Sequence, residues 1–343
     1  MSGASRAPAM VSHPAGPEPD PVADQVMDSV KMLPGPFKKD SFSMPTVSAI
    51  IPAYNGAARY LEQAIRSVLS QTFSDLELLV VDDASTDETG RLVLRVQQAR
   101  YIRRAENGGQ AAARNDGAHL AKGDYLAFLD QDDLWEPTFL EETLAILRAN
   151  PDAAVVHCDG YQVSEQNEIL YYDHAMMDLV SITQILRGGH DVATSGSLFR
   201  KVCFDAVGGY DERLTIWEDI DLAIRLYRKY PLIHHPKPVY RHRLYARNVS
   251  RDIPSERTLE ARRYFLDKHG PSCRRGTPEA RGLARDWAHY YGDLGKFYAR
   301  EGRTADARKA FWLSVRHHPL NHKNLLRLLR AYVAPGRKPG PAG

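Results

Sequence analysis

The chain has 343 residues, of which 43% are hydrophobic, and this is enough for one large buried core plus an appendage. Its 45 Lys and Arg residues almost balance 43 Asp and Glu residues, and the net charge of +2 argues against a nucleic-acid partner. The three scattered cysteines favour reduced thiols, and no run approaches the roughly 18 apolar residues of a membrane span, so we expect a cytoplasmic protein.

Residues 1–43 are rich in Pro, Gly, Ala and Ser, and we expect them to form a disordered leader. From 44 to 254 the chain alternates strand and helix patterns, which predicts a Rossmann-like α/β domain with a mostly parallel sheet flanked by helices. The expected strands span 47–51, 76–81, 101–103, 125–130 and 153–157. The expected helices between them span 57–70, 92–97, 109–121 and 137–149.

Residues 255–334 show only helical patterns, and residues 335–343 are expected to be a disordered tail. The helical region contains residues in an order that resembles one tetratricopeptide-type hairpin: Tyr290, Leu294, Tyr298, Ala305, Ala307, Ala310, Phe311 and Pro319. The last helix, over 323–333, has a leucine stripe beside Arg327 and Arg330. This helix is a candidate for peripheral contact with the inner face of an anionic membrane, and the alternative is packing on the hairpin.

The most informative run follows the strand at 125–130, where Asp130, Asp132 and Asp133 crowd together. Like charges packed this closely repel unless a cation lies among them. Residues two apart in an extended segment point the same way, so Asp130 and Asp132 can converge on one ion while Asp133 points elsewhere. Oxygen ligands without nearby His or Cys favour Mg²⁺ or Mn²⁺ over zinc, and such an ion leaves positions open for substrate phosphates. The alternative is a solvated acidic turn that caps the helix after Pro137.

Polar residues collect where the expected strands end. Asn55 follows the first strand, Asp82 and Asp83 follow the second, and the acidic run follows the fourth. Open α/β sheets bind ligands in the crevice outside the carboxyl ends of their strands. These separate segments therefore predict a single binding cleft.

The same segments carry short motifs in a fixed order: VSAIIPAYN at 47–55, VDDASTD at 81–87, NGG at 107–109 with ARN at 113–115, DQDD at 130–133, and GGYDE at 208–212 leading to Glu218 and Asp219. Together these motifs resemble those of family 2 glycosyltransferases, which are inverting enzymes of the GT-A fold. The resemblance implies transfer of a sugar from a nucleotide-sugar donor, with UDP as the expected nucleotide. The acceptor would be a hydroxyl of a saccharide, a lipid-linked saccharide or a protein.

The resemblance also implies a donor pocket after the first two strands. Its nucleobase side would be lined by Pro52, Ala53, Tyr54 and Asn55. Asp82 and Asp83 would contact the base and the ribose, with the choice between them left open. The alternative role for this acidic pair is to cap the helix that starts near residues 85–87, and we expect both roles in one loop.

Further roles follow from the resemblance for the charged residues of the cleft. Arg114 would reach the nucleotide, whereas a surface arginine on a helix is the alternative. Asp130 would contact the donor, and together with Asp132 it would hold the Mn²⁺ or Mg²⁺ that neutralises the departing diphosphate. Asp219 would be the general base that takes the proton of the acceptor hydroxyl, with Glu218 and 221 as the alternative positions. One such displacement inverts the anomeric configuration.

For three further residues the sequence leaves two interpretations open. Trp217 is a candidate for stacking on a sugar face, or it belongs to the core. His242 is a candidate for approaching the metal or the diphosphate, or it lies on the surface. Asp133 either joins the metal site or points away from it.

Two other classes of protein compete with the transferase. A nucleotidyltransferase would share the sheet and the metal-bound phosphates, but residues 52–56 lack its Gly-rich basic phosphate loop. A non-catalytic adaptor would act through the helical C-terminal region and would not need the acidic residues. All of these acidic residues are present.

Overall fold

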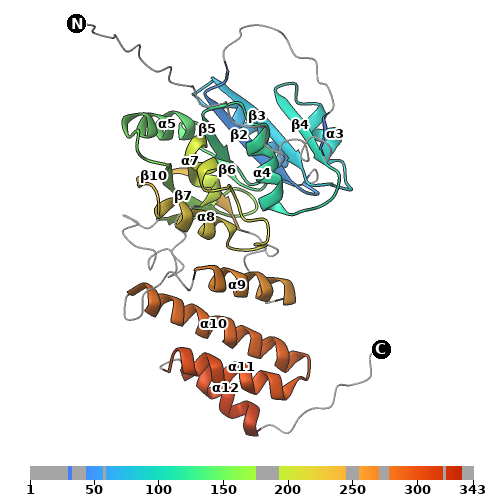
Figure 1. Cartoon of the computed structure of the whole chain (residues 1–343). Coiled ribbons are helices and arrows are strands. Elements are labelled where there is room, and N and C mark those ends of the chain that lie inside the picture. The colour runs from blue at the N-terminus through green and yellow to red at the C-terminus, as the bar shows by residue number, and fades with distance from the viewer. Residues whose placement is uncertain are drawn as a thin grey trace, which may run out of the picture.

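The computed structural model describes residues 30–32, 44–56, 59–174, 193–244, 255–269, 278–319 and 322–333 (Figure 1). The strands are β1 (Val30–Met32), β2 (Val47–Ala53), β3 (Leu76–Asp82), β4 (Ala99–Arg104), β5 (Tyr125–Phe128), β6 (Leu134–Trp135), β7 (Val155–Val163), β8 (Ile169–Asp173), β9 (Ser197–Arg200) and β10 (Leu232–Arg243). In this part of the chain they form one ten-stranded sheet in the order β1-β4-β3-β2-β5-β9-β7-β10-β6, with β8 beside β7.

The parallel part of the sheet agrees with the sequence prediction. Strands β4, β3, β2 and β5 are neighbours and all pair in parallel, so their carboxyl ends lie at one edge. Strand β2 continues through Pro52, which pairs with Val81, and ends only at Ala53. The loops that follow β2, β3 and β5 therefore meet at this edge.

The rest of the sheet is more mixed than the alternating pattern indicated. Strand β9 lies antiparallel between β5 and β7. Strand β6 pairs antiparallel with β10, β8 pairs antiparallel with β7, and β10 runs parallel to β7. The α/β class is confirmed, but only four of the ten strands have the simple parallel order. Strand β1 also pairs with β4, so part of the expected leader at 1–43 joins the sheet.

Helices cover both faces of the sheet. They are α2 (Leu61–Leu69), α3 (Thr89–Leu94), α4 (Gln110–Leu120), α5 (Phe139–Ala149), α7 (Lys201–Ala206) and α8 (Glu218–Tyr227). One buried apolar cluster joins α2 and α5 to the sheet, and the other joins α4 and α8. The helix expected at 92–97 lies earlier, at α3, and the helix expected from residue 57 begins at Leu61.

The C-terminal region is helical, as predicted. It contains α9 (Glu256–His269), α10 (Pro278–Arg300), α11 (Thr304–His317) and α12 (His322–Val333), which Figure 1 shows stacked in succession beside the sheet domain. A side chain at Gly295 of α10 would begin 2.6 Å from the ring of Phe311, so the glycine lets α11 pack closely. The structure thus has a helical hairpin, and its assignment to the tetratricopeptide type stays a prediction.

Helix α9 is tied to the first turns of α8 by buried charges. The Asp221 carboxylate is fully buried and lies 2.8 Å from His269 Nε2 and 2.7 Å from both Lys268 Nζ and Arg225 Nε. Burial alone would raise the pKa of Asp221, but the His269 hydrogen bond and the two cations outweigh it and lower the pKa to about 2. The helical region therefore supports the sheet domain at α8.

We expect Asp221→Asn to destabilise the protein by roughly 2 kcal/mol at neutral pH, because a carboxyl whose pKa falls from 3.8 to about 2 stabilises the folded state. This stabilisation is present above the unfolded pKa and is lost as pH falls from about 4 towards 2. Urea unfolding at several pH values measures it. Asp205→Asn, which removes an exposed partner of Lys201, is the control and should change stability by less than about 0.5 kcal/mol. The free energies of unfolding of Asp221→Asn and the unchanged protein should differ less at pH 3 than at pH 7. An equal difference at the two pH values would contradict the role given to Asp221.

Candidate active site

The acidic loop after β5 separates its three carboxylates. Asp133 is buried, where its carboxylate accepts hydrogen bonds from the Ser195 hydroxyl (2.6 Å) and the Arg243 main-chain N–H (3.0 Å). Burial raises the pKa of Asp133, and the nearby Asp132 and Asp130 carboxylates raise it further. Asp130 and Asp132 remain half-exposed. Asp133 points into the protein, away from Asp130 and Asp132, as predicted. The reason is not strand alternation, because β5 ends at Phe128 and the Asp133 N–H donates to the Asp130 carbonyl (3.0 Å), so residues 130–133 form a turn.

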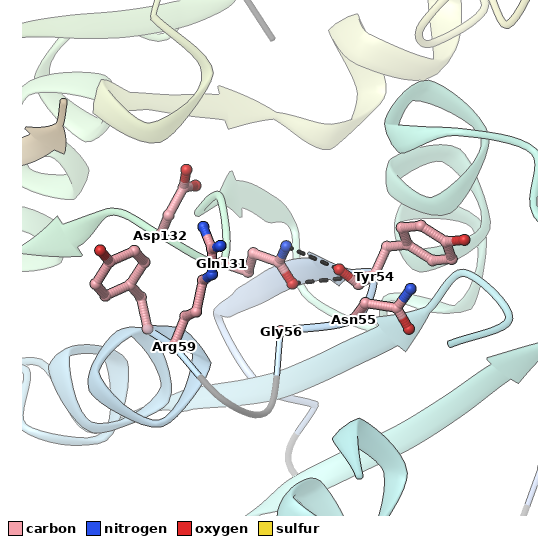
Figure 2. Close-up of a pocket in the computed structure, with 7 residues that line it drawn as sticks. Tyr54, Asn55, Gly56, Arg59, Gln131 and Asp132 are labelled. Carbon is pink, nitrogen blue, oxygen red and sulfur yellow. Dashed lines mark hydrogen bonds between the residues drawn. The ribbon is translucent and has the colours of Figure 1, made fainter. Parts of the chain in front are cut away.

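A cavity of about 250 Å³ lies between this loop and the loop after β2 (Figure 2). It is lined by Tyr54, Asn55, Gly56, Arg59, Tyr60, Gln131 and Asp132. The Gln131 side chain donates to the Tyr54 carbonyl (3.1 Å) and accepts from the Tyr54 N–H (3.0 Å), as the dashed lines in Figure 2 show. A Cβ atom on Gly56 would lie 2.3 Å from the Gln131 amide oxygen, so this glycine makes room for the brace. Gln131 therefore fixes the acidic loop to the loop of the expected nucleobase pocket.

Asp82 and Asp83, after β3, both hold loops in place. Asp82 is fully buried, and it accepts hydrogen bonds from the Ser85 N–H (2.8 Å), the Arg103 guanidinium (2.6 Å) and the Tyr101 hydroxyl. The Ser85 contact stabilises a turn. The expected capping of a helix at 85–87 is wrong, because α3 begins at Thr89 and its N-cap residue is Glu88.

Asp83 accepts from Arg104 (2.6 Å) and from the N–H groups of Gly108 (2.9 Å) and Gly109 (2.8 Å), which precede α4. The loop after β2 joins the same network, because the Asn55 side chain accepts from the Thr86 N–H at 2.9 Å. The segments expected to form the donor pocket are therefore fastened to one another.

Arg114 of α4 lies between the acidic loop and α8, and only 1% of its side chain is exposed. Its guanidinium donates to Asp130 at 2.5 Å and to Glu218 at 2.9 Å, and it lies 5.2 Å from the centre of the Tyr210 ring. Burial disfavours the charged form, yet the carboxylates of Asp130 and Glu218 hold the pKa of Arg114 above its usual value. The surface alternative for this arginine is wrong.

Helix α4 can carry a buried arginine because it packs unusually close to the sheet. Its buried residues are mostly small, and a Cβ atom on Gly117 would lie 2.5 Å from a methyl group of Ile50 in β2. From α4 the Arg114 guanidinium reaches Asp130, which follows β5. The Arg114 side chain then spans from α4 to α8.

The two carboxylates at the start of α8 also differ in how buried they are. Glu218 is 3% exposed and is held by Arg114 and by the Gln110 side-chain amide, whereas Asp219 is more accessible and bonds the N–H of Ile220 at 2.7 Å. Burial raises the pKa values of both carboxyls; the Asp219 charge adds to the shift of Glu218, and the Asp130 charge adds to that of Asp219. Asp221, the other alternative base, is fully buried against α9. Asp219 is therefore the most exposed carboxylate of this set.

The remaining candidates lie at the margins of this site. Trp217 has a left-handed backbone (φ 65°), and its ring packs on Phe265 (5.2 Å between ring centres) and under the Arg262 guanidinium (4.5 Å). These contacts with α9 favour the core interpretation. His242 lies in β10, with Nδ1 3.0 Å from the Gln162 side-chain nitrogen, and its charge would lower the pKa of Asp133. His242 is thus near the acidic loop, on its buried side.

The donor set of the acidic loop suits a hard divalent cation. In the described ranges, no group of three or more His, Cys, Asp or Glu side chains is arranged to hold a metal. Mg²⁺ and Mn²⁺ need fewer protein ligands when phosphate oxygens complete their coordination, and Asp130 and Asp132 offer carboxylates at the rim of the cavity. The mutual repulsion that helps raise the pKa of Asp133 is a further sign of excess negative charge. The residues present therefore fit such an ion.

An α/β sheet with acidic loops gathered at the ends of its parallel strands is the GT-A arrangement expected from the sequence. Residues 48–208 match the family model for glycosyl transferase family 2. These residues, a little under half of the chain, are similar to family 2 glycosyl transferases.

Related sequences agree with this assignment. An uncharacterized glycosyltransferase of Rickettsia prowazekii is 33% identical over 198 residues, which cover 55% of this chain and 61% of the relative. The chondroitin synthase of Escherichia coli is 28% identical over 216 residues, which cover 60% of this chain and 30% of the synthase. The chain thus spans about three fifths or less of the length of these relatives.

Solved structures share the fold at low identity. TarS residues 1–349 from S. aureus, in complex with UDP-GlcNAc, superpose with a TM-score of 0.59 at 19% identity, over 84% of this chain and 89% of that one. The mannosyltransferase PcManGT from Pyrobaculum calidifontis, in complex with GDP-Man and Mn²⁺, gives a TM-score of 0.50 at 19% identity over 91% and 86% of the two chains. At this identity the likeness shows a common fold.

Sequence reasoning missed two residues of this site, Gln131 and Arg243. Gln131 lies in the turn at 130–133, where it lines the same cavity as Asp132, and no local pattern singles it out. Arg243 bonds a loop more than one hundred positions earlier in the chain, and no local pattern indicates such a contact.

We expect Arg114→Met to destabilise the protein by about 3–5 kcal/mol at neutral pH, because it leaves Glu218 and Asp130 without their buried cation. The loss should shrink as pH falls and Glu218, whose pKa is already raised, becomes protonated. Urea unfolding across pH measures both effects. Arg66→Met, which breaks an exposed pair with Glu62, is the control and should cost less than about 1 kcal/mol. Equal losses for the two variants would contradict the role given to Arg114.

Proposed function

We propose that the protein transfers a sugar from a nucleotide-sugar donor, with UDP as the expected nucleotide, to an acceptor hydroxyl with inversion at the anomeric carbon. The observation that carries this proposal is the network around Arg114. It joins the acidic loop, which would face the diphosphate, to α8, which presents Asp219. A transferase needs these two groups on opposite sides of the anomeric carbon.

The donor would bind at the carboxyl ends of β2, β3 and β5. Its nucleobase would lie against Pro52, Ala53, Tyr54 and Asn55, whose loop is braced by Gln131 and Thr86. Asp82 is fully buried and would act only by holding the walls of this pocket. Asp83 would also hold them, and its remaining acceptor capacity would be available to the base or ribose. The UDP-GlcNAc complex of TarS supports the choice of uridine, and the GDP-Man complex of PcManGT marks guanosine as the competing nucleotide.

Asp130 and Asp132 would hold Mn²⁺ or Mg²⁺, and when bound this ion supplies charge neutralisation for the diphosphate leaving group. The Mn²⁺ in the PcManGT structure supports this assignment. Arg114 keeps Asp130 in position and prevents the carboxylate from turning to solvent. Asp133 and His242 would support the loop from its buried side.

Asp219 would remove the proton from the acceptor hydroxyl as its oxygen bonds to the anomeric carbon. At the same time the bond from that carbon to the phosphate oxygen breaks, and its electron pair leaves with the nucleoside diphosphate. The raised pKa of Asp219 suits this task, because a base is more effective when its pKa approaches the working pH. Glu218 holds Arg114 and is a positioning residue in this account.

A nucleotide-release assay distinguishes this activity from the two competing classes. Incubation with a panel of nucleotide sugars, Mn²⁺ and candidate acceptors should release a nucleoside diphosphate. Release of pyrophosphate from a nucleoside triphosphate and a sugar phosphate would instead indicate a nucleotidyltransferase. The family 2 match at residues 48–208 favours the first outcome.

We expect Asp219→Asn to bind the donor with unchanged affinity and to lose about 10²–10⁴-fold in turnover, because the amide cannot accept the proton. Thermal stabilisation by the donor with Mn²⁺ reports binding, and diphosphate release reports turnover. Asp205→Asn, on the surface away from the site, should keep full turnover. A fully active Asp219→Asn enzyme would remove the base assignment.

We also propose a peripheral contact between α12 and an anionic membrane, which would suit a lipid-linked acceptor. Leu328 packs on α11, but Leu325, Leu326 and Leu329 are 39%, 53% and 53% exposed. The chain has no Asp or Glu after Asp306, so these leucines lie in a uniformly basic segment. Exposed apolar side chains among cations bind anionic bilayers. Among the described helices, none is both long and apolar enough to cross a bilayer.

Cosedimentation with vesicles of phosphatidylcholine and phosphatidylglycerol tests this contact. Leu329→Asp should reduce binding several-fold, because it places a carboxylate at the lipid surface, and binding should weaken as salt increases. The matched control is Leu94→Asp in α3, where an equally exposed leucine lies outside the basic segment. Equal binding of both variants, or no binding by the unchanged protein, would dispose of the membrane contact.

A further inference from the structure

Arg243, at the end of β10, is a second fully buried arginine near the acidic loop. Its guanidinium donates to the main-chain carbonyls of Asp132 (3.0 Å), Ser164 (3.2 Å) and Glu165 (2.8 Å) and to the Gln63 side chain (3.0 Å). It also lies 4.3 Å from the centre of the Tyr60 ring. One side chain thus joins the acidic loop to the turn between β7 and β8 and to α2.

The main chain of the same residue acts on the neighbouring carboxylate. The Arg243 N–H donates to Asp133 at 3.0 Å, so Arg243 holds the loop at two successive residues, the carbonyl of Asp132 and the side chain of Asp133. Both contacts lie on the C-terminal side of Asp132, where they fix the peptide that links it to Asp133, and this restricts the directions in which the Asp132 side chain can point. Asp132 also lines the cavity beside Tyr60 and Arg59.

Only an arginine can make this set of contacts. Its planar guanidinium presents five N–H donors in fixed directions, whereas a lysine ammonium offers three donors at one point. The four acceptors of Arg243 belong to three separate segments, so a lysine would lose part of the set. The geometry of the acidic loop would then depend on weaker local contacts.

We propose that Arg243 is a positioning residue that presets Asp132 for a divalent cation, and this inference rests on the proposed function. Groups that orient a metal ligand from behind typically change metal affinity by about 10–100-fold when they are replaced. This role differs from general support of the fold. Replacing Arg243 should lower the affinity for the cation beyond what any loss of folding stability explains.

The test is a titration of Mn²⁺ followed by electron paramagnetic resonance of the free ion, with UDP present. We expect Arg243→Lys to weaken Mn²⁺ binding about 10-fold or more. Gln63→Ala, which removes one acceptor from an exposed position on α2, should weaken it by a smaller factor. Asp132→Ala removes the proposed ligand itself, so its Mn²⁺ binding shows the effect of losing that ligand completely.

Arg200→Lys is a matched control. Arg200 also donates to main-chain carbonyls, those of Ala153 (3.2 Å) and Leu147 (3.0 Å), and it lies 5.3 Å from the Tyr125 ring. It pairs with Tyr125, at the end of β5 opposite the acidic loop. Its replacement should lower the melting temperature and leave Mn²⁺ affinity unchanged.

The outcomes separate this inference from the proposed function. If the unchanged protein binds no Mn²⁺ in the presence of UDP, the metal-dependent function fails and the role of Arg243 falls with it. If the unchanged protein binds Mn²⁺ and folded Arg243→Lys binds it equally well, only the role of Arg243 is overturned. Should Arg243→Lys not fold, Gln63→Ala decides: weakened binding supports the role, and unchanged binding overturns it.

Discussion

An arginine keeps its charge even when it is buried, so the guanidinium of Arg114 needs groups that compensate this charge, and Asp130 and Glu218 supply them. These two carboxylates lie at the end of β5 and at the start of α8, segments that are far apart in the chain. The Arg114 network therefore fixes the acidic loop relative to the helix that carries Asp219. Movement of either element would leave a buried charge without its partner, so the spacing between the two chemical groups is built into the folded state.

The rest of the structure supports this network from several sides. Gln131 holds the acidic loop to β2, Arg243 holds it to β7 and α2, and the contacts of Asp221 with α9 hold the helix α8. The helical region therefore contributes to the site although it supplies none of the proposed reacting groups. Because α9 lies close to α8, the Trp217 ring packs against Phe265 and Arg262, which gives Trp217 a structural role.

Local patterns in the sequence predicted the parts of the fold that depend on local physics. The parallel strands β2 to β5 follow from their apolar runs. The direction of Asp133 was predicted for the wrong reason, because a turn at 130–133 sets it and not strand alternation. Strand β9 was missed because it is short and antiparallel, and its place depends on pairing with β5 and β7. The burial of Arg114 could not be predicted, because a helix of small residues has no clear apolar face and the partners of the arginine come from distant segments.

The most direct measurement is a crystal structure of the protein with a UDP-sugar and Mn²⁺. The account predicts that the diphosphate lies at Asp130 and Asp132 and that the anomeric carbon lies between it and Asp219. It also predicts that Arg114 keeps its contacts with Asp130 and Glu218 when the donor is bound. A donor bound elsewhere, with Asp130 and Asp132 turned to bulk solvent, would contradict the proposed chemistry.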